Sequence, residues 1–552
     1  MPKLFRQVHL LGLAMKTSLI ARSVLTILLS LCSLSSYAYS ADKSSNKAKP
    51  AVDHSKAEKL YEVHCQSCHG VDRLGAMGPA LLPENLARFR QKKAIKVINK
   101  GRAATQMPAF GQVLNKSEIA SLVDYIYTPS KASLKWTMAD INASKIQHFD
   151  QSKLPNTAQF EADLMNLFIV VELGDHSATL LNGDTFERLD RFKTRFALHG
   201  GPKYSPDGRF VYFASRDGWI SKYDIYNRKT VSEVRAAINT RNIAISSDGK
   251  YLIVGNYLPQ NVVILDADDL SPIKVIDAVD SEGNSSRVSA VYNAPPRYSF
   301  IVALKDVKEV WEIPYSDKGG VEVYKGWAHD YKNEAKAEGW KVQEQFPVRR
   351  IKTDDYLNDF FFDPDYINLI GTARNNHNGQ VINLDTKKKV ASIALTGMPH
   401  LGSGITWHYQ DKEVFASPNI KEGKITVIDM EDWNVIKEIK TEGPGFFMRS
   451  HSNSPYAWTD VFFGPNNDKV HVIDKSTLKI VKTLAPSPGK NAAHVEFTKD
   501  GKYVLLSVWD MDGELIVYDA NTLEIVTRMP MKKPSGKYNV FNKISYEKGT
   551  SH

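Results

Sequence analysis

The sequence predicts a small α-helical domain followed by an all-β domain built as an eight-bladed β-propeller. Two features of the 552 residues predict this order. Apolar residues recur at helical spacing on both sides of a cysteine motif at residues 65–69, and a strand-rich unit recurs about every 45 residues from residue 161 to the end. A period of that length is typical of propellers, so the repeat decides the fold class before any single strand is assigned.

The first forty residues have the pattern of a secretory signal. Their charged residues are all basic: Lys3, Arg6, Lys16 and Arg22. An apolar run at 23–34 and the small residues at 38–40 follow, which is typical of a cleaved signal rather than a membrane span. We therefore expect residues 1–40 to be removed on export to the periplasm, and no transmembrane segment in the mature chain. Translation could start at Met1 or at Met15, and the Lys- and Ser-rich residues 41–52 are predicted to be a disordered leader.

The charge balance argues against nucleic-acid binding. The formal net charge is +9, and removing the four basic residues of the signal leaves +5 (9 − 4). That is a mild excess rather than the clustered basic stripe that nucleic acids require. We expect no nucleic-acid partner, whereas acidic small molecules or an acidic protein remain open.

The motif Cys65-Gln66-Ser67-Cys68-His69 has the spacing at which two thiols attach a haem beside the histidine that ligates its iron. The alternatives are a reduced thiol pair or half of a zinc site. No second cysteine pair follows to complete a zinc site, and no βαβ pattern surrounds the motif. The sequence therefore predicts a covalent haem c on Cys65 and Cys68, with His69 as an iron ligand.

The second iron ligand is predicted to be Met107, because a thioether raises the reduction potential of a haem and so suits an electron carrier. Met77 is an alternative, although it lies so close to His69 that the chain would hardly reach the opposite face of the haem. The other alternative is that the methionine ligates no metal and only fills a gap in the core. Helices are expected over 55–65 and over 117–127, the second capped by Ser117, which makes residues 53–130 a class I cytochrome c domain.

A linker is expected at 131–160 and the propeller at 161–552. Each repeat begins with a turn, as in Asp207-Gly208, Asp248-Gly249 and Asp500-Gly501, where glycine takes the positive φ of a tight hairpin. We count eight repeats, starting near residues 166, 205, 247, 293, 363, 409, 453 and 498. Four-stranded blades arranged radially protect their own edges. The insertion 319–346 is expected to form a helical excursion between blades.

Two histidines beside glycine-rich turns are candidates for the mouth of the central channel: His199, before Gly200-Gly201, and His400, before Leu401-Gly402. A propeller by itself implies no chemistry. A loop histidine is more often a surface residue or a satisfied hydrogen-bonding group, so the residues alone leave both unassigned.

The combination of a class I haem domain with an eight-bladed propeller resembles the cytochrome cd1 nitrite reductases and their relatives in haem d1 metabolism. The stretches that carry the resemblance are Ala197-Leu198-His199, Arg216-Asp217-Gly218, Thr240-Arg241-Asn242, Gly397-Met398-Pro399-His400, Ser507-Val508-Trp509 and the run 534–542. The resemblance implies that His199 ligates the iron of a non-covalent haem d1 and that Arg216 and Arg241 bind its carboxylates. A guanidinium fork suits that role.

The sequence departs from the reductases where two distal histidines would deliver protons to nitrite. One of these positions holds Asn358, and an amide cannot deliver a proton as imidazolium does. The C-terminal run 537–552 is instead similar to the dihydro-haem d1 dehydrogenase branch, which desaturates a propionate of dihydro-haem d1 to an acrylate. By that resemblance His400 is the second ligand of the substrate iron, and His494 and Tyr538 are the catalytic pair beside the reacting propionate.

The resemblance further implies that electrons pass to haem c and then to an external periplasmic acceptor. Nitrite reductase or haem d1 transfer proteins are further partners that it suggests. Two other functions stay open: a nitrite reductase, which Asn358 disfavours, and a haem d1 carrier without chemistry. A pure carrier would have no use for the electron exit that Cys65, Cys68 and His69 provide.

Overall fold

A computed structural model describes residues 54–76, 78–86, 89–101, 107–316, 345–372 and 378–546. The predicted signal peptide and leader lie outside these ranges, as do residues 319–344 of the predicted insertion and the last six residues of the C-terminal run. No helix within the described ranges is both long and apolar enough to cross a bilayer.

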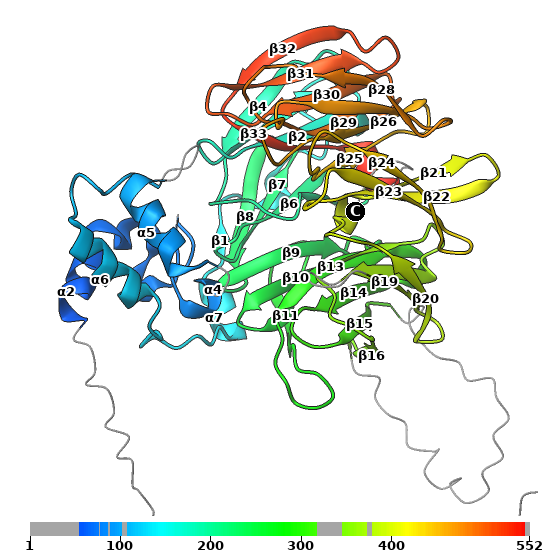
Figure 1. Ribbon diagram of the computed structural model, residues 1–552. Coiled ribbons are helices and arrows are strands. Elements are labelled where there is room, and N and C mark those ends of the chain that lie inside the picture. Colours follow the sequence, from blue (N-terminus) through cyan, green and yellow to red (C-terminus); the bar gives the residue numbers. More distant parts are fainter. Residues whose placement is uncertain are drawn as a thin grey trace, which may run out of the picture. The chain divides into compact units, whose positions relative to one another are not determined.

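The N-terminal part is helical, as predicted. Its helices are α2 (Ser55–His64), α3 (Gln66–His69), η1 (Val71–Arg73), α4 (Pro83–Leu86), α5 (Gln91–Lys100) and α6 (Lys116–Ile126) (Figure 1). α2, α5 and α6 bury one apolar stripe each, and Tyr61, Ile98 and Leu122 meet in a shared core. This packing holds the cysteine motif, which spans the end of α2 and the short helix α3.

The cap of α6 differs from the prediction. The helix begins at Lys116, and Asn115 is its N-cap, with Glu118 completing a capping box. Asn115 Oδ1 accepts the backbone N–H of Glu118 at 3.0 Å, and Ser117 Oγ donates to the same oxygen at 2.6 Å. Ser117 is therefore inside the first turn, because the Asn115 side chain, two residues earlier, already caps the N–H of Glu118.

The rest of the described chain folds into eight antiparallel sheets, which we number as blades 1 to 8. Blades 1 to 4 contain β33 (Pro534–Asn539), β2 (Leu167–Glu172), β3 (Ser177–Asn182) and β4 (Arg188–Lys193); β5 (Lys203–Tyr204), β6 (Phe210–Ala214), β7 (Trp219–Asp224) and β8 (Lys229–Arg235); β9 (Asn239–Ile245), β10 (Tyr251–Leu258), β11 (Asn261–Asp266) and β12 (Pro272–Asp277); and β13 (Val288–Ala294), β14 (Ser299–Leu304), β15 (Glu309–Pro314) and β16 (Arg349–Lys352).

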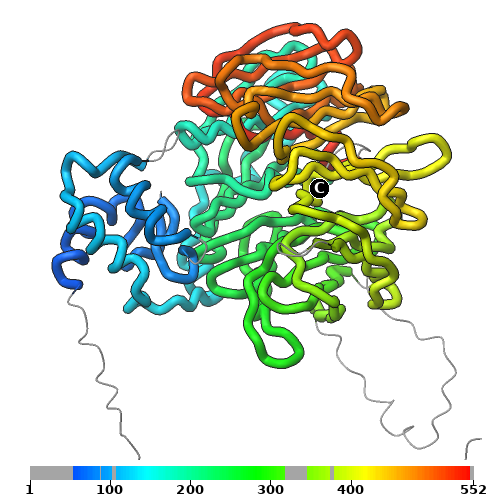
Figure 2. Tube along the Cα trace, in the orientation of Figure 1, coloured from blue at the N-terminus to red at the C-terminus, as the bar shows by residue number. Residues whose placement is uncertain are grey.

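Blades 5 to 8 contain β17 (Asp359–Phe362), β18 (Asn368–Thr372), β19 (Asn378–Asn383) and β20 (Lys388–Ala394); β21 (Ile405–Tyr409), β22 (Lys412–Pro418), β23 (Lys424–Asp429) and β24 (Val435–Lys440); β25 (Met448–Arg449), β26 (Tyr456–Asp460), β27 (Val470–Asp474) and β28 (Lys479–Leu484); and β29 (Ala492–Phe497), β30 (Tyr503–Val508), β31 (Gly513–Asp519) and β32 (Ile525–Met531). The first strand named for each blade is its inner strand. The predicted eight-bladed β-propeller is confirmed (Figure 1, Figure 2).

Eight clusters of buried apolar side chains join neighbouring blades and close the ring. Each cluster draws its residues from two consecutive blades, and the cluster containing Phe168 and Leu505 joins blade 8 back to blade 1. Burial of this apolar surface is the main favourable contribution to the fold. Ring closure also depends on the C-terminal strand β33, which pairs with β2 and places Tyr538 opposite Ile169.

The predicted repeat and the observed blade are offset by one strand. Each repeat supplies the three outer strands of one blade and then the inner strand of the next. The Asp-Gly turns open these repeats as predicted, with φ of +74° at Gly208 and +73° at Gly501. The offset interlocks consecutive blades, because every inner strand is covalently continuous with the blade before it.

The segment predicted as a linker, 131–160, has structure of its own. It contains α7 (Met138–Ala143), β1 (Ile146–Gln147) and η2 (Gln151–Lys153), and β1 pairs with β8 as a fifth strand of blade 2. The remaining short elements are η3 (Leu164–Asn166), η4 (Pro295–Arg297), η5 (Leu401–Ser403) and the C-terminal helix α9 (Val540–Ile544).

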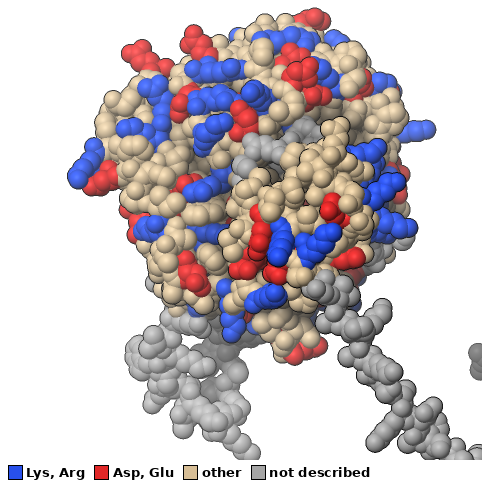
Figure 3. Space-filling view, turned by 90° about the vertical axis from the view of Figure 1, so that its left-hand side faces the viewer, with Lys and Arg blue, Asp and Glu red and all other residues tan. Residues whose placement is uncertain are grey.

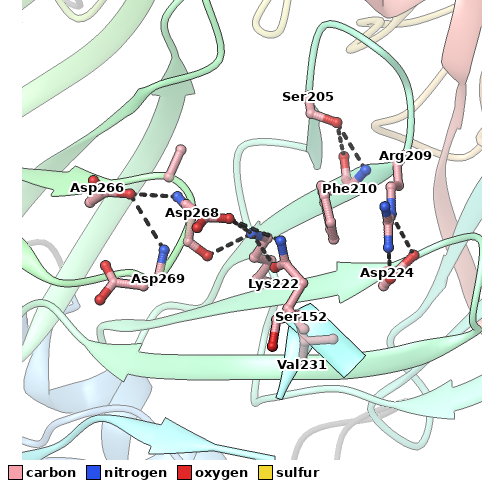
Figure 4. Close-up of polar contacts among 12 residues, drawn as sticks. Ser152, Ser205, Arg209, Phe210, Lys222, Asp224, Val231, Asp266, Asp268 and Asp269 are labelled. Carbon is pink, nitrogen blue, oxygen red and sulfur yellow. Dashed lines mark hydrogen bonds and ion pairs between the residues drawn. The ribbon is translucent and has the colours of Figure 1, made fainter. Parts of the chain in front are cut away.

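A buried lysine joins this segment to blades 2 and 3. Lys222, on β7, is 1% exposed, and its Nζ donates to Gln151 Oε1 at 2.7 Å. It also donates to the Asp268 carbonyl oxygen at 2.6 Å (Figure 4). Arg209 pairs nearby with the fully buried Asp224 at 3.0 Å. Burying a charged group is costly unless it is paired and hydrogen-bonded, as these groups are. On the face drawn in Figure 3, acidic and basic side chains are interspersed without a continuous stripe of one sign.

Candidate functional site

The two motif cysteines and His69 are arranged as a haem attachment requires. Cys65 and Cys68 form no disulfide and are partly exposed. His69 is buried and donates its Nδ1 proton to the Pro79 carbonyl oxygen at 2.8 Å, which leaves Nε2 as the nitrogen that could coordinate a metal. A Cβ at Gly78 would lie 2.9 Å from the imidazole ring, so only glycine fits beside it. These residues fit a covalent haem c.

Met107, the predicted second ligand, packs against the helical core that contains Leu122. The five residues before it, 102–106, lie outside the described part of the chain, and so does the alternative ligand Met77. The assignment of Met107 to the haem c iron therefore stays a prediction.

The inner strands of the propeller surround a cavity of about 340 Å³, which we call the histidine cavity. Its lining includes five of the six residues predicted for the propeller site: His199, Arg241, His400, His494 and Tyr538. They come from five different blades and lie on the inner strands or on the loops just before them. Closure of the ring therefore brings together residues that are up to 339 positions apart in the sequence.

His199 donates its Nδ1 proton to the Arg241 carbonyl oxygen at 2.7 Å, which directs Nε2 away from that contact. Burial, together with the charges of Arg216 and Arg241, holds the pKa of His199 well below 6.5, so the ring is neutral at pH 7, the form in which an imidazole can ligate a metal. Arg241 Nη1 lies 2.9 Å from Nε2, the nitrogen that would face iron. The guanidinium must therefore move aside when a metal ligates this ring.

His400 is held in the same way from another blade. It donates its Nδ1 proton to the Phe446 carbonyl oxygen at 2.7 Å, and its Nε2 lies 4.0 Å from Asp359 Oδ2. Burial lowers the pKa of His400, although Asp359 opposes the shift. Asp359 is itself fixed by Tyr292, whose hydroxyl donates at 3.1 Å, and by the N–H of Gly402 at 2.9 Å.

His494 occupies a β-bulge in β29. Ala493 pairs with Ser507 and Val495 with Leu506, so His494 is the extra residue, and its φ is +55°. Positive φ is uncommon outside glycine, although histidine adopts it more often than most residues, and β-bulges are frequent next to active sites. The bulge turns the side chain into the cavity lining while leaving Nδ1 buried without a hydrogen-bond partner in the described structure.

The environment of His494 makes it a free base at neutral pH. Burial, reinforced by the charges of Lys537, Arg449 and Lys543, places the pKa of His494 well below 6.5. Its ring lies 5.3 Å from that of Tyr538, measured between centroids, in an edge-on contact. Burial raises the pKa of Tyr538 to about 12, so this phenol keeps its proton and can donate or relay one.

Asp460, at the end of β26, connects the His400 and His494 sites. Its Oδ1 accepts the N–H groups of Phe446 at 2.7 Å and Phe447 at 3.1 Å, and its Oδ2 accepts the N–H of His494 at 3.2 Å. Phe446 in turn supplies the carbonyl oxygen that orients His400. One buried carboxylate therefore positions both imidazoles through the backbone.

Replacing Asp460 with alanine is expected to slow turnover by about tenfold to a hundredfold, because both imidazoles lose their backbone anchor. Absorbance titration with the tetrapyrrole should also show weaker coordination. The matched control is Asp474→Ala, which removes a turn-capping carboxylate from the same blade at a position outside the cavity lining. Equal behaviour of the two variants would contradict the positioning role.

Aromatic side chains form one wall of the histidine cavity. The His400 ring lies 4.0 Å from that of Phe446, and Phe447 contacts both His494 at 4.6 Å and Trp509 at 6.0 Å, between ring centroids. Flat, apolar walls suit a planar macrocycle. Arg449 also lines the cavity; it is 3% exposed, and its Nε makes no hydrogen bond with the described residues but lies 3.9 Å from Oε2 of the buried Glu496. A buried guanidinium of this kind fits a carboxylate of a bound molecule.

Arg216 and Asn358 are placed differently from the other predicted residues. Arg216 is absent from the lining of the histidine cavity; its guanidinium lies 5.7 Å from the Tyr257 ring, next to Thr240. Asn358 also lies outside the lining, and its Oδ1 accepts from Lys305 Nζ at 3.2 Å. The next residue, Asp359, lines the cavity, whereas Asn358 does not.

Sequence reasoning did not identify Asp359, Arg449 or Asp460. The signal that it could have used is a charged residue in a run of apolar ones: Asp359 begins the strand Asp-Phe-Phe-Phe, and Asp460 ends Tyr-Ala-Trp-Thr-Asp.

Comparison with known proteins places this cavity in a family. The model for the cytochrome D1 heme domain matches residues 162–543, which cover more than half of the chain and carry the whole histidine cavity. The chain belongs to the cytochrome D1 heme domain family. Residues 52–126 match the model for cytochrome C oxidase, cbb3-type, subunit III, in agreement with the predicted haem c domain.

The relatives of this chain carry the names of different activities. The chain is 55% identical over 495 residues to dihydro-heme d1 dehydrogenase of Pseudomonas aeruginosa, covering 90% of this chain and 95% of that protein. A solved structure of dihydro-heme d1 dehydrogenase NirN in complex with DHE superposes with a TM-score of 0.80 at 55% identity, covering 89% of this chain and all of the other. Nitrite reductase of Stutzerimonas stutzeri is 25% identical, covering 90% of this chain and 94% of that protein.

Proposed function

We propose that this chain is an oxidoreductase of haem d1 biosynthesis, a dehydrogenase that oxidises dihydro-haem d1 to haem d1 and passes the electrons to its own haem c. The observation that carries the proposal is the histidine cavity, where two oriented imidazoles, His199 and His400, stand beside the neutral His494 of the bulge and the phenol of Tyr538. The relative that is 55% identical and bears this activity in its name supports it.

In this proposal the two imidazoles hold the iron of the substrate, and Arg241, in the cavity lining, binds a carboxylate. The predicted role of Arg216 would require its side chain to leave Tyr257 and Thr240 and reach the cavity. Arg241 already lies beside His199, so binding would exchange one contact for the other. The substrate iron is then enclosed on both faces, which orients the reacting side chain and leaves no open position for nitrite.

The reaction converts –CH₂–CH₂–COO⁻ to –CH=CH–COO⁻ and releases two protons and two electrons. His494 is unprotonated at neutral pH and can accept a proton from the side chain, while Tyr538 orients the propionate or relays a proton. Haem c supplies the electron sink once it is attached to Cys65 and Cys68.

We place the reaction in the periplasm, because the basic and apolar pattern of residues 1–40 is that of an export signal. The electron acceptor is then an external periplasmic carrier. Nitrite reductase or haem d1 transfer proteins are proposed as recipients of the product.

The direct test is incubation of the purified holoprotein with dihydro-haem d1 and an electron acceptor. We expect the absorbance of the acrylate-bearing product to appear and the haem c band to become reduced when the acceptor is withheld. Binding without spectral conversion would instead identify a carrier. Consumption of nitrite without conversion of dihydro-haem d1 would identify a nitrite reductase.

A further inference from the structure

The proposed oxidation releases protons at a place that the substrate itself closes. His494 is 2% exposed, and a macrocycle that fills the histidine cavity would cover the mouth on that side. Each turnover nevertheless has to deliver two protons to water. The inference that follows rests on the proposed function and concerns the route of these protons.

A second cavity, of about 540 Å³, lies farther along the same inner strands, and we call it the lysine cavity. On β9, Arg241 lines the first cavity, and Ala244, three residues later, lines the second. On β17, Asp359 likewise lines the first cavity and Phe361 lines the second. Pro202 and Tyr292 belong to both linings. The two cavities are therefore successive compartments of the propeller channel. Residues 542–546, in and after α9, line the second cavity.

Lys543, on α9, stands between the two compartments. It lines the lysine cavity, and its Nζ lies 5.8 Å from the centre of the Tyr538 ring, which lines the histidine cavity. Its charge also acts on His494, where it helps to lower the pKa. One side chain thus faces the catalytic pair on one side and room for water on the other.

The groups around Lys543 keep it poised to exchange protons. Burial, with the charge of Arg449 and against that of Glu496, lowers the pKa of Lys543 to about 7. Glu496 is fully buried on β29 and accepts from Asn542 Nδ2 at 3.2 Å, next to Lys543 on α9. Burial likewise lowers the pKa of Lys203, in the wall of the lysine cavity, to about 8. Groups that titrate near the working pH are the most effective proton carriers.

We propose that Lys543 relays the protons released at His494 and Tyr538 into the lysine cavity, from which they reach solvent. In each transfer an N–H or O–H bond breaks at the donor and forms at the acceptor. The proton passes from the imidazole or phenol to the neutral Lys543 amine through a bridging water, and then to water in the second cavity. No electrons move along this route, because they leave through the iron.

Two substitutions at Lys543 test the relay. Lys543→Arg keeps a cation of similar length, but its guanidinium cannot release a proton near pH 7. Lys543→Ala leaves space that a small amine can enter. The matched control is Lys499→Met, which removes a lysine that contacts Phe541 of α9 but pairs with Asp163 outside both cavities.

Conversion of bound dihydro-haem d1 is followed in a single turnover by rapid-mixing absorbance. We expect both Lys543 variants to bind the tetrapyrrole with unchanged spectra and to convert it at least about tenfold more slowly, while Lys499→Met matches the wild type. Methylamine should restore the rate of Lys543→Ala in proportion to the concentration of its free base. It should leave Lys543→Arg slow.

The outcomes separate this inference from the proposed function. Wild-type protein that binds but does not convert dihydro-haem d1 would refute the function itself. If the wild type converts dihydro-haem d1 and Lys543→Arg converts it equally fast, the relay is refuted but the proposed function is not. A slow Lys543→Ala that methylamine cannot accelerate, together with a fast Lys543→Arg, would show that Lys543 serves only as a structural cation.

Discussion

Replacing His494 with alanine is expected to lower the rate of dihydro-haem d1 oxidation by at least about a hundredfold, while the variant still binds the substrate. The substitution removes the proton acceptor but leaves His199 and His400, the proposed iron ligands, in place. Alanine adopts the positive φ of the bulge less readily than histidine, so some loss of stability is expected besides the loss of the base. The measurement is single-turnover conversion combined with an absorbance titration of binding.

The matched control is His471→Ala. His471 is equally buried, in blade 7, where it hydrogen-bonds Thr483 at 2.8 Å, and it lies outside the histidine cavity. Its loss should lower stability without changing the rate of conversion. Unchanged turnover in His494→Ala would reject the role of His494 as the base.

The pH profile of the wild type provides a second readout of His494. A base works only when unprotonated, so the rate falls as the pH drops through the pKa of that base. Because burial lowers the pKa of His494, the acid limb is expected below pH 6.5 rather than at or above it. A limb near pH 7, where Lys543 titrates, would report the proton relay and should be absent from Lys543→Ala. An acid limb above pH 6.5 that persists in Lys543→Ala would indicate a different base.

Replacing both Cys65 and Cys68 with alanine is expected to abolish sustained turnover with an external acceptor, although the propeller still binds the tetrapyrrole. Thioether attachment to these two sulfurs is what retains haem c in the helical domain. The histidine cavity does not depend on haem c, since its lining comes entirely from residues 171–538. Steady-state assays should therefore lose activity, whereas substrate titrations should look like those of the wild type.

Ser67→Ala is the control for the cysteine variant, because it changes the same motif but keeps both thiols and His69. It should attach haem c and turn over normally. Full steady-state activity in the double cysteine variant would mean that electrons leave the propeller by another route, and the division of labour between the two domains would be wrong.

The haem c motif and the repeat could be predicted because both are encoded locally. Cys65, Cys68 and His69 lie within five residues, so their spacing alone specifies the chemistry. The Asp-Gly turns recur with one period, and the eight repeats correspond to eight blades after an offset of one strand. The cap of α6 was predicted two residues too late, because Ser117 and Asn115 are both good caps and only the hydrogen bond to Glu118 distinguishes them.

The propeller site was predicted only through resemblance, and its supporting residues were not predicted at all. The bulge that turns His494 inward depends on the pairing of β29 with β30, and its anchor, Asp460, comes from 34 positions earlier in the chain. Lys543 lies only five residues after Tyr538, but its place beside the second cavity depends on the packing of α9 against blades 1 and 2. No local pattern encodes such contacts.

The amino-acid sequence by itself determined that this chain carries a covalent haem domain and a closed ring of eight sheets, because spacing and periodicity are properties of the covalent chain. Which imidazoles, carboxylates and amines meet in the central channel was decided only by the tertiary structure. Ring closure brings together inner strands that are hundreds of residues apart, and burial there sets which groups are charged.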